Sequence, residues 1–458
     1  MIVNQLQGQE SPHETWIRNT WPRPGMSTTS ATGSGPLGRF LCYNEAWQYQ
    51  DIQTGATVSG NTDPLAALNA RLQDLKSRND LIDAGAIGYV SFDWGSQTRR
   101  SARPPSNADD WQLPDMQFHV FEKLTHPEAR LEASPATKQH SYTRVELDEI
   151  VGRDGVRSLV SKSRYLADVS RLKEHIAAGD IYQANYTQGF EINTSRTSAA
   201  NADRLGARLR APYFAHLRFG PSAIICADGA SSRFPEMAVI AASPERFWRV
   251  QHGAVDSRPI KGTIGRASSA LQDCERRRQL LTSRKDRAEL LMITDLVRND
   301  LGQVAEIGSV KTQALVRIRP TPSVWHLEST VTAQLDPAKS WIDVMKALHP
   351  AGSISGTPKL RALEILDTLE KVRRGPYCGA IGWVDANGNA DFAVAIRTCV
   401  QVGKTIRIYG GGGIIADSDP EAEYYESLVK IAPILESLCE SPRQDRSSTR
   451  RTAQEYNA

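Results

Sequence analysis

The spacing of apolar positions along the chain predicts a fold that mixes strands with helices. Short apolar or alternating runs predict strands at 86–94, 180–188, 238–242, 377–384, 392–398 and 405–409. Apolar residues that repeat every three or four positions predict helices at 66–75, 165–178, 286–297 and from 420 onward. We therefore expect an α/β fold of the α+β type.

The two ends of the chain lack this periodicity. Residues 1–36 are rich in Ser, Thr, Gly and Pro, which predicts a flexible leader, and residues 441–458 combine arginines with polar residues, which predicts a disordered tail. Between them, 37–150 contains strand-like pieces but no evident chemistry. The motifs that carry chemistry all lie within 160–437, so we expect the catalytic domain there.

Composition excludes several classes of protein without choosing a function. The 458 residues are 40% hydrophobic and 23% charged, which is ordinary for a soluble globular enzyme. A net charge of +3 favours neither nucleic acid nor a membrane surface as a partner. The six cysteines contain no C-x-x-C pair, and no segment approaches the ~20 apolar residues of a membrane span, so we expect a cytoplasmic protein with reduced thiols.

The first candidate for chemistry is the lysine within residues 259–263. Lys261 follows the apolar Ile260 and precedes Gly262, whose missing side chain allows the backbone to bend and a ligand to approach. A neutral lysine amine is a nucleophile, but free lysine titrates near ~10.4, so the amine would need desolvation. On these residues alone, a solvated loop lysine remains the alternative.

Two further candidates lie at strands. Glu245 comes directly after the predicted strand 238–242, which places it at a sheet edge or the rim of a pocket. His326 lies inside the apolar run 324–328, where a buried structural histidine is the alternative to a catalytic one. The glycines and hydroxyls of 350–359 precede a helix and suit an anion, because such turns expose backbone N–H groups.

Two helices carry acidic residues on one face. Asp286 and Glu289 are three residues apart, and Glu423, Glu426 and Lys430 lie within about 60° of one another on the last helix. For the last helix, a salt-bridged surface and a pocket wall that supplies oxygens to a metal are equally compatible with this pattern. For 286–297, the residues alone favour an amphipathic helix with a charged outer surface. The glycine run before that helix matches neither G-x-G-x-x-G nor the P-loop, which excludes the usual nucleotide-binding motifs.

Six motifs follow one another along the second part of the chain. They are PIKGT at 259–263, DLVRNDLG at 295–302, GTPKLRA at 356–362, RRGPYCG at 373–379, AIRT at 395–398, and the segment 410–421. In this order they resemble the motifs of the chorismate-utilising enzymes, a family that includes anthranilate, aminodeoxychorismate, isochorismate and salicylate synthases. The resemblance covers about 160–437 and is faint in 37–150. It implies two large antiparallel-rich sheets packed as a sandwich, with helices outside.

The resemblance also distinguishes branches of the family. Anthranilate synthases usually carry alanine where this chain has Lys261, and isochorismate and salicylate synthases carry a water-activating lysine where it has Gln183. The combination present here resembles the aminodeoxychorismate branch. An anthranilate synthase component I, an aminodeoxyisochorismate synthase and a catalytically silent chorismate-binding subunit are the alternatives.

The family mechanism implies a role for each candidate side chain. Lys261 would attack C2 of chorismate, Glu245 would protonate the departing C4 hydroxyl, and His326 would orient the substrate. Glu289 and Glu426 would ligate Mg²⁺, with Glu423 and Asp286 behind them. The expected substrate-contacting residues are Tyr377, Arg397, Gly411, Gly413, Lys430, Thr263 and Ser355.

Ammonia is the second substrate that this branch implies. The chain contains no recognisable nucleophile motif of a glutamine amidotransferase. We therefore expect a separate glutamine amidotransferase subunit as partner, and a product that leads to 4-aminobenzoate and folate.

Overall fold

The computed structural model describes residues 15–19, 31–33, 35–79, 83–94, 111–125, 142–226, 229–321 and 324–439. The expected tail at 441–458 lies outside these ranges, as does most of the expected leader. Within the leader, however, β1 (Thr15–Asn19) pairs with β10 (Tyr213–Phe219) and with β2 (Ala31–Gly33). These strands differ from the expectation because the edge of β10 supplies backbone hydrogen bonds, which composition does not reveal.

The first sheet, sheet A, gathers strands from both halves of the chain. In the described residues its order is β19-β9-β23-β22-β13-β10-β1-β2, with β8 also pairing with β9. Besides β1, β2 and β10, its strands are β8 (Val156–Ser158), β9 (Gln183–Asn193), β13 (Met237–Ser243), β19 (Gly356–Thr357), β22 (Thr398–Val402) and β23 (Thr405–Ile414). The pairs are antiparallel, and β23 runs along β9 over ten residue pairs, from Thr405 to Ile414.

The second sheet, sheet B, has the order β16-β18-β15-β14-β21-β20-β6-β7-β3-β4-β5, with β17 also pairing with β18. Its strands from the amino-terminal third are β3 (Gly38–Tyr43), β4 (Ala46–Asp51), β5 (Thr57–Gly60), β6 (Gly85–Val90) and β7 (Met116–Phe121). The others are β14 (Arg246–Gln251), β15 (Ala254–Ser257), β16 (Ile260–Gly265), β17 (Lys311–Pro320), β18 (Val324–Gln334), β20 (Ala380–Asp385) and β21 (Ala390–Val394). Because β6 pairs with β20, the amino-terminal third and the catalytic region share one sheet.

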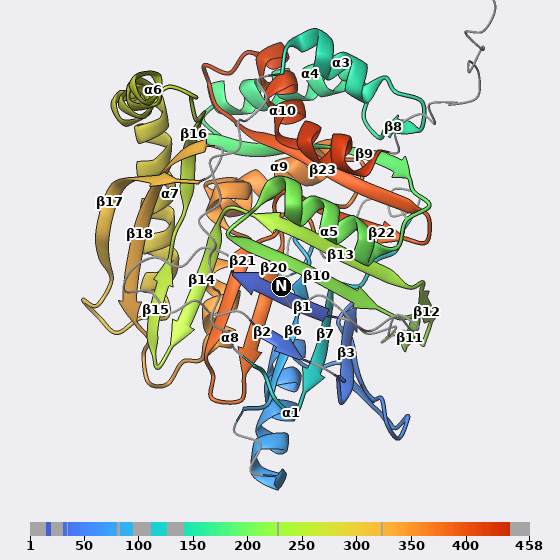
Figure 1. The fold of residues 1–458 in the computed structure, drawn as a ribbon. Coiled ribbons are helices and arrows are strands. Elements are labelled where there is room, and N and C mark those ends of the chain that lie inside the picture. The colour runs from blue at the N-terminus through green and yellow to red at the C-terminus, as the bar shows by residue number, and fades with distance from the viewer. Residues whose placement is uncertain are drawn as a thin grey trace, which may run out of the picture.

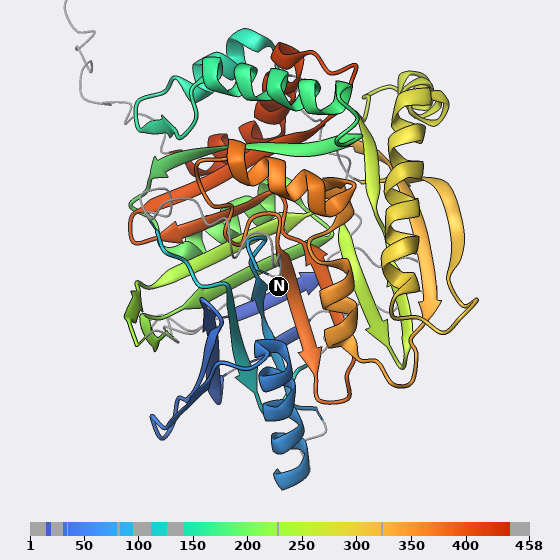
Figure 2. The ribbon, with the colours of Figure 1, turned by 180° about the vertical axis from the view of Figure 1, so that it is seen from behind.

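Helices cover the outer faces of both sheets (Figures 1 and 2). They are α1 (Pro64–Asn79), α3 (Arg144–Val151), α4 (Lys162–Ala177), α5 (Ser198–Leu209), α6 (Ala270–Thr282), α7 (Arg284–Gly302), α8 (Trp341–Leu348), α9 (Lys359–Leu369) and α10 (Pro420–Leu438). A hairpin of β11 (Ser222–Ile225) with β12 (Ser231–Phe234) and a 3-10 turn, η2 (Gly352–Ile354), complete the elements used below. None of the described helices is both long and apolar enough to cross a membrane.

Three apolar clusters hold these layers together. One packs α1, α7 and α8 on sheet B, and another packs α4, α5, α9 and α10 on sheet A. The third lies between the sheets, where Tyr89 and Trp383 of sheet B meet Leu217 and Val239 of sheet A. The expected sandwich of two antiparallel-rich sheets with helices outside is therefore confirmed.

The two residues that precede α10 fix the start of this helix. The helix cap is Asp419, whose side chain accepts a hydrogen bond from the Ala422 backbone, and Pro420 occupies the first turn. Ser418 instead donates its hydroxyl hydrogen to Glu423 Oε1 at 2.7 Å. This bond directs a carboxylate of the first helical turn toward β23.

Candidate active site

A bulge in β16 positions the expected nucleophile. Pairing with β18 shifts by one residue between Lys261 and Thr263, and Thr263 lies opposite His326. The intervening Gly262 has φ +73°, a left-handed conformation that favours glycine. A methyl group at Gly262 would lie 2.8 Å from Cβ of Asp286, near the start of α7. The bulge and α7 together set the direction of the Lys261 side chain.

The amine of Lys261 reaches across to β23 of sheet A. A methyl group added at Gly413 would lie 3.2 Å from Lys261 Nζ and 2.5 Å from Gln183 Nε2. Lys261 is half-buried and Gln183 is fully buried. The glycine at 413 therefore leaves the space in which an amine and an amide, 78 positions apart in the chain, meet at one strand.

Charges from α7, from α10 and from the turn after β13 surround the Lys261 amine. Burial lowers the pKa of Lys261, and the neighbouring Lys430 lowers it further. Three carboxylates oppose this change and raise the pKa of Lys261; they belong to Glu289, Glu245 and Glu426. A lowered pKa increases the fraction of neutral amine, which is the form that can act as a nucleophile.

Glu245 is a buried acid beside this amine. Its side chain is 4% exposed, and Ser353 donates a hydrogen bond to Oε1 at 2.7 Å. Burial raises its pKa to about 7, and Glu328 acts in the same direction, whereas Ser353, Lys261 and the Ile260 backbone N–H oppose the change. Glu245 therefore carries a proton over much of the neutral pH range and can donate it.

His326 is buried and neutral. Its Nδ1 lies 2.8 Å from the Thr263 hydroxyl across the bulge. Burial lowers the pKa of His326 to about 3, and Arg319 and Arg397 add to the effect. A histidine with this pKa is suited to hydrogen bonding or orientation and not to donating a proton at neutral pH.

Carboxylates of α7 and α10 face the same region. Burial raises the pKa of Glu289, and Asp286 and Glu426 add to that rise. Glu426 is paired with Lys430 at 2.9 Å, and this cation lowers the pKa of Glu426. Burial raises the pKa of Glu423, which lies over the backbone of β23.

The acidic residues of α7 and α10 can supply only part of the oxygen ligands that Mg²⁺ requires. In the part of the chain that is described, no group of three or more His, Cys, Asp or Glu side chains could hold a metal ion. Glu289 and Glu426 nevertheless interact electrostatically, and Mg²⁺ commonly uses one or two carboxylates and takes its remaining oxygens from water and substrate. These two residues therefore suit an ion completed by substrate, and the four expected acids do not form a complete protein cage.

Two cations and a tyrosine suit the carboxylates of a substrate. Arg397 has no hydrogen-bond or ion-pair partner for its guanidinium among the described residues, and burial lowers its pKa. Tyr377 is buried close enough to Arg397 to affect that pKa. Lys430 donates to the Gly411 carbonyl at 2.8 Å. Among the described residues, the half-buried Arg397 lacks the anion that a guanidinium removed from water ordinarily requires.

The glycine run of β23 borders an open strip of sheet A. β22 pairs with β23 only as far as Cys399 opposite Ile408. Beyond that point, from Tyr409 to Ile414, β23 pairs with β9 on one side alone in the described residues. Because an unpaired strand edge presents backbone N–H groups, this segment, with Gly411 and Gly413, can receive an anion.

The turn before α9 contains two serines with different contacts. Ser355, an expected substrate contact, is fully buried and donates its hydroxyl hydrogen to the Ala351 carbonyl at 2.9 Å. Ser353 is the residue that contacts Glu245. Both serines lie in one short turn, which the sequence indicated. The path of η2 determines that the Ser353 hydroxyl points to Glu245.

Sequence reasoning also left Gln183 without a positive role. Neither side-chain atom of Gln183 has a hydrogen-bond partner among the described residues, although the side chain is fully buried. A buried amide without partners is costly, so it suits a position that a ligand completes. The signal in the sequence was a polar residue within the strand that faces the glycine run.

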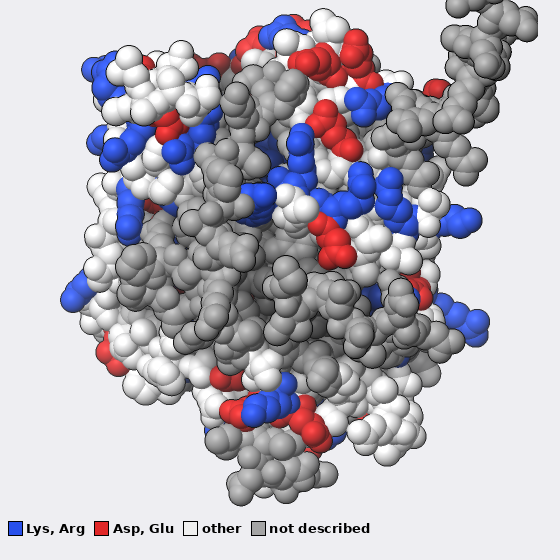
Figure 3. All heavy atoms as spheres, viewed as in Figure 1, with Lys and Arg blue, Asp and Glu red and all other residues white. Residues whose placement is uncertain are grey.

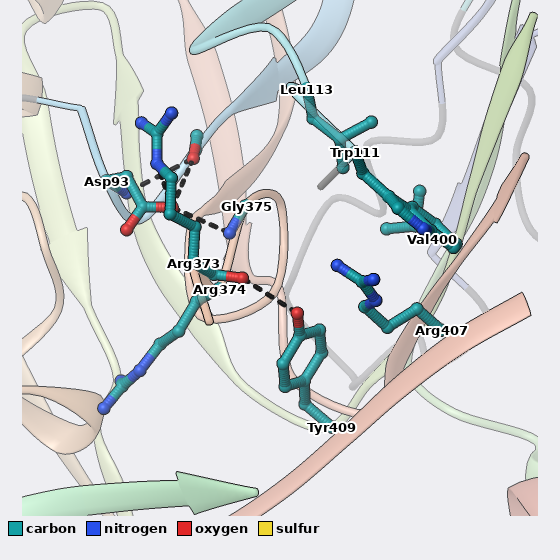
Figure 4. A pocket seen from close by; sticks show the side chains of 10 residues that line it. Asp93, Trp111, Leu113, Arg373, Arg374, Gly375, Val400, Arg407 and Tyr409 are labelled. Atoms are coloured by element: carbon teal, nitrogen blue, oxygen red, sulfur yellow. Dashed lines mark hydrogen bonds and ion pairs between the residues drawn. The ribbon is translucent and has the colours of Figure 1, made fainter. Parts of the chain in front are cut away.

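A separate hollow lies behind Tyr409 (Figure 4). Arg373, Trp111 and Arg407 line it, and the Tyr409 hydroxyl donates to the Arg373 carbonyl at 2.8 Å. The charges there are already paired, since Arg373 contacts Asp115 at 3.1 Å. The Tyr409 ring stacks on Tyr377, with ring centroids 5.2 Å apart. Tyr409 therefore separates this hollow from Tyr377 and packs against that expected substrate contact.

The surface beside β16 is positively charged. Basic side chains gather over α6 (Figure 3), where Arg277 and Arg278 are exposed, and Arg284 and Arg287 are exposed at the start of α7. Positive potential near a site increases the encounter rate of anionic substrates. The surface and the interior of this region therefore favour the same sign of ligand.

A half-buried amine, a buried acid, acidic residues of two helices and a guanidinium without a partner among the described residues meet at the junction of two antiparallel sheets. These features define a chorismate binding enzyme: the chain belongs to that family, whose sequence profile matches residues 20–436. Among its relatives is aminodeoxychorismate synthase component 1 of Klebsiella aerogenes, which is 35% identical over 416 residues, 85% of this chain and 86% of that protein.

Other relatives belong to neighbouring branches. Anthranilate synthase component 1 of Saccharolobus solfataricus is 34% identical over 402 residues, 84% of this chain and 88% of that protein. The crystal structure of anthranilate synthase component I from Streptococcus pneumoniae covers 94% of each chain with a TM-score of 0.68 and 25% identity. A putative isochorismate synthase, DhbC from Bacillus anthracis, shares the fold over 94% of this chain, with a TM-score of 0.69 and 20% identity.

Proposed function

We propose that this enzyme converts chorismate and ammonia into 4-amino-4-deoxychorismate through a covalent adduct on Lys261. The observation that carries the proposal is the meeting of the Lys261 amine with Gln183 at Gly413, beside the buried acid Glu245. The names of several relatives, which are aminodeoxychorismate synthases, support this branch.

The first half of the reaction removes the hydroxyl group. The neutral Lys261 amine forms a bond to ring carbon C2, both ring double bonds shift, and the bond between C4 and its oxygen breaks. Glu245 gives its proton to that oxygen, so water leaves. Glu245, now a carboxylate, accepts the proton that the alkylated amine releases.

The second half reverses the shift. Ammonia forms a bond to C4, the double bonds return, and the bond between C2 and the lysine nitrogen breaks. Glu245 gives its proton to the departing lysine nitrogen and takes one back from the new ammonium group at C4. Gln183, whose buried amide oxygen has no partner among the described residues, can accept a hydrogen bond from ammonia. One water is lost and one ammonia is gained, and the enolpyruvyl group is retained.

Substrate binding uses the charges around this centre. Arg397, Tyr377 and Lys430, with the backbone of Gly411 and Gly413, would hold the enolpyruvyl carboxylate. His326, neutral and bonded to Thr263, would orient the ring. Mg²⁺ held by Glu289 and Glu426 would supply a Lewis acid for the ring carboxylate.

The ammonia source belongs to the same proposal. Several relatives are named component 1, which supports a second component, and we propose a glutamine amidotransferase. We place the reaction in the cytoplasm, on the route to 4-aminobenzoate and folate. Ammonium salts should support activity when the partner is left out.

Product analysis of the Lys261→Ala variant tests the function. The wild-type protein, given chorismate, Mg²⁺ and ammonium chloride, should form aminodeoxychorismate, whereas Lys261→Ala should lose about 10²-fold or more of that activity. Lys404→Ala, which removes an exposed lysine, is the matched control and should behave as wild type. Mass spectrometry of protein incubated with chorismate should detect an adduct on the Lys261 peptide.

Two outcomes would overturn the proposal. Fluorescent anthranilate and pyruvate as the products would assign the protein to the anthranilate branch. An unchanged rate and product in Lys261→Ala would remove the covalent step while leaving membership of the family intact.

A further inference from the structure

A buried ion pair lies directly behind Glu245. Arg319 on β17 and Glu328 on β18 are joined by a contact of 2.9 Å between Nη1 and Oε2, with side chains only 6% and 1% exposed. The desolvation cost of such a pair can exceed its Coulombic gain, so it is weak evidence for stability. The position of the pair offers another reason for its presence.

Arg319 holds the backbone that carries the acid. The same Nη1 atom donates to the carbonyl oxygen of Pro244 at 3.0 Å, and Pro244 immediately precedes Glu245. This bond ties the turn after β13 to the edge strand of sheet B. A shift of the turn would move the Glu245 carboxyl away from Ser353 and from Lys261.

Glu328 places a negative charge on the other side of the acid. It lies opposite Ile260 in the β16–β18 register, and the Ile260 N–H is one of the groups bonded to the Glu245 carboxyl. Arg319, in turn, lies opposite His326 in the β17–β18 register. The negative member of the pair therefore acts on Glu245 and the positive member acts on His326.

We propose that Arg319, anchored by Glu328, is a positioning residue for the acid step: its guanidinium holds the Pro244–Glu245 turn while Glu328 keeps a fixed charge behind the acid. Neither residue takes part in bond making. The inference rests on the proposed function in assigning the acid role to Glu245.

Several groups around Glu245 influence its protonation. Lys261 on β16 and the Ser353 hydroxyl on η2 favour the charged form, as does the Ile260 N–H. Burial and Glu328 favour the neutral form. Glu328 is thus the one carboxylate among these groups, and changing it alters the balance in a single direction.

The pH dependence of Glu328→Gln tests the inference. Glutamine keeps an oxygen acceptor for Arg319 but removes the negative charge, so the loss of kcat/KM on the alkaline side should begin about 0.5–1 pH unit lower than in wild type. Asp300→Asn, which breaks the buried pair of Lys359 with Asp300 elsewhere in the molecule, is the matched control. It should lower the melting temperature without moving the pH profile.

A second variant separates positioning from folding. The double variant Arg319→Met with Glu328→Leu replaces the pair by apolar side chains, which buried pairs often tolerate. We expect a folded protein with kcat reduced about tenfold or more and little change in KM. If it unfolds instead, Arg319→Lys, which keeps the charge but reaches fewer acceptors, should show the same loss in kcat.

The outcomes also separate this inference from the proposed function. A wild-type kcat and pH profile in Glu328→Gln and in whichever Arg319 variant folds would overturn the positioning role, provided that Glu245→Gln is inactive. Full activity of Glu245→Gln would instead show that the proposed acid is wrong. That result would remove the basis of both conclusions.

Discussion

Carboxyl groups of the same chemistry differ in this protein because of their surroundings. Glu245 is almost fully buried, and its pKa is raised to about 7, whereas the pKa of Glu426 is lowered because Lys430 lies 2.9 Å away. The first is suited to hold a proton near neutral pH, and the second to remain an anion. One side-chain type can thus be held in two different protonation states within one site.

The Glu245→Gln variant should show how much stability the protein loses by burying an ionisable carboxyl group. Between about pH 4.5 and 7 the folded state keeps a proton that the unfolded chain has lost, so the free energy of unfolding falls as pH rises through this window. Glutamine cannot ionise, so the variant should be more stable than wild type at pH 8 by up to about 3 kcal/mol. Urea unfolding at pH 4.5 and pH 8 measures the difference.

The difference in stability should nearly vanish at pH 4.5, where both forms of residue 245 are neutral. The variant should also be inactive at both pH values, since it has no proton to give. An equal difference in stability at the two pH values would contradict the raised pKa of Glu245.

At the scale of elements, the site depends on irregular backbone at the ends of regular structure. The bulge in β16 uses a left-handed glycine, η2 directs Ser353 to Glu245, and α10 begins where Ser418 holds Glu423. Regular strands alone would alternate their side chains and could not bring Lys261 and Thr263 to these positions.

Gly262→Ala should damage both stability and catalysis. The new methyl group would lie 2.8 Å from Cβ of Asp286, and the alanine would have to keep the positive φ of Gly262. We therefore expect the free energy of unfolding to fall by about 2–3 kcal/mol and kcat to fall about 10²-fold. Gly308→Ala is the matched control, because Gly308 has φ +78° but nothing within 4 Å.

The control should lose about 1 kcal/mol from backbone strain and keep its activity. Thermal unfolding and steady-state kinetics measure both effects. If Gly262→Ala behaved like Gly308→Ala, the contact between the bulge and α7 would have no part in directing Lys261.

At the scale of the whole molecule, the amino-terminal third is part of the same sandwich as the catalytic region. β6 pairs with β20, and Tyr89 of β6 packs with Trp383 and Leu217 between the sheets. A segment outside the six sequence motifs thus supplies part of the core between the sheets. The sequence motifs placed the expected chemistry in 160–437 but did not show that this region shares a sheet and a core with the amino-terminal third.

A fragment of residues 142–439 should therefore fail to fold by itself. Removing β3 to β7 exposes the edge of β20 and opens the apolar cluster between the sheets. We expect weak near-ultraviolet circular dichroism and no cooperative thermal transition, in contrast to the full chain. A sharp transition in the fragment would show that the catalytic region folds independently.

The sequence by itself determined the local elements and the family. Apolar periodicity placed strands near β6, β13 and β23 and helices near α4 and α7, because backbone geometry repeats every two or 3.6 residues and burial selects the side chains that follow it. The motifs around Lys261, Arg397 and Gly410 to Gly413 placed the chain in its family, and the sandwich that this implied was confirmed.

Tertiary structure alone decided which side chains meet. Lys261 and Gln183 meet at Gly413, Ser353 of η2 bonds to Glu245, and Arg319 pairs with Glu328 behind that acid. These relations depend on strand order, on one bulge and on burial by segments far away in the chain. Local sequence patterns carry no information about contacts between residues that are far apart in the chain. The raised pKa of Glu245, about 7, likewise arises only because the folded chain has removed water from around its carboxyl group.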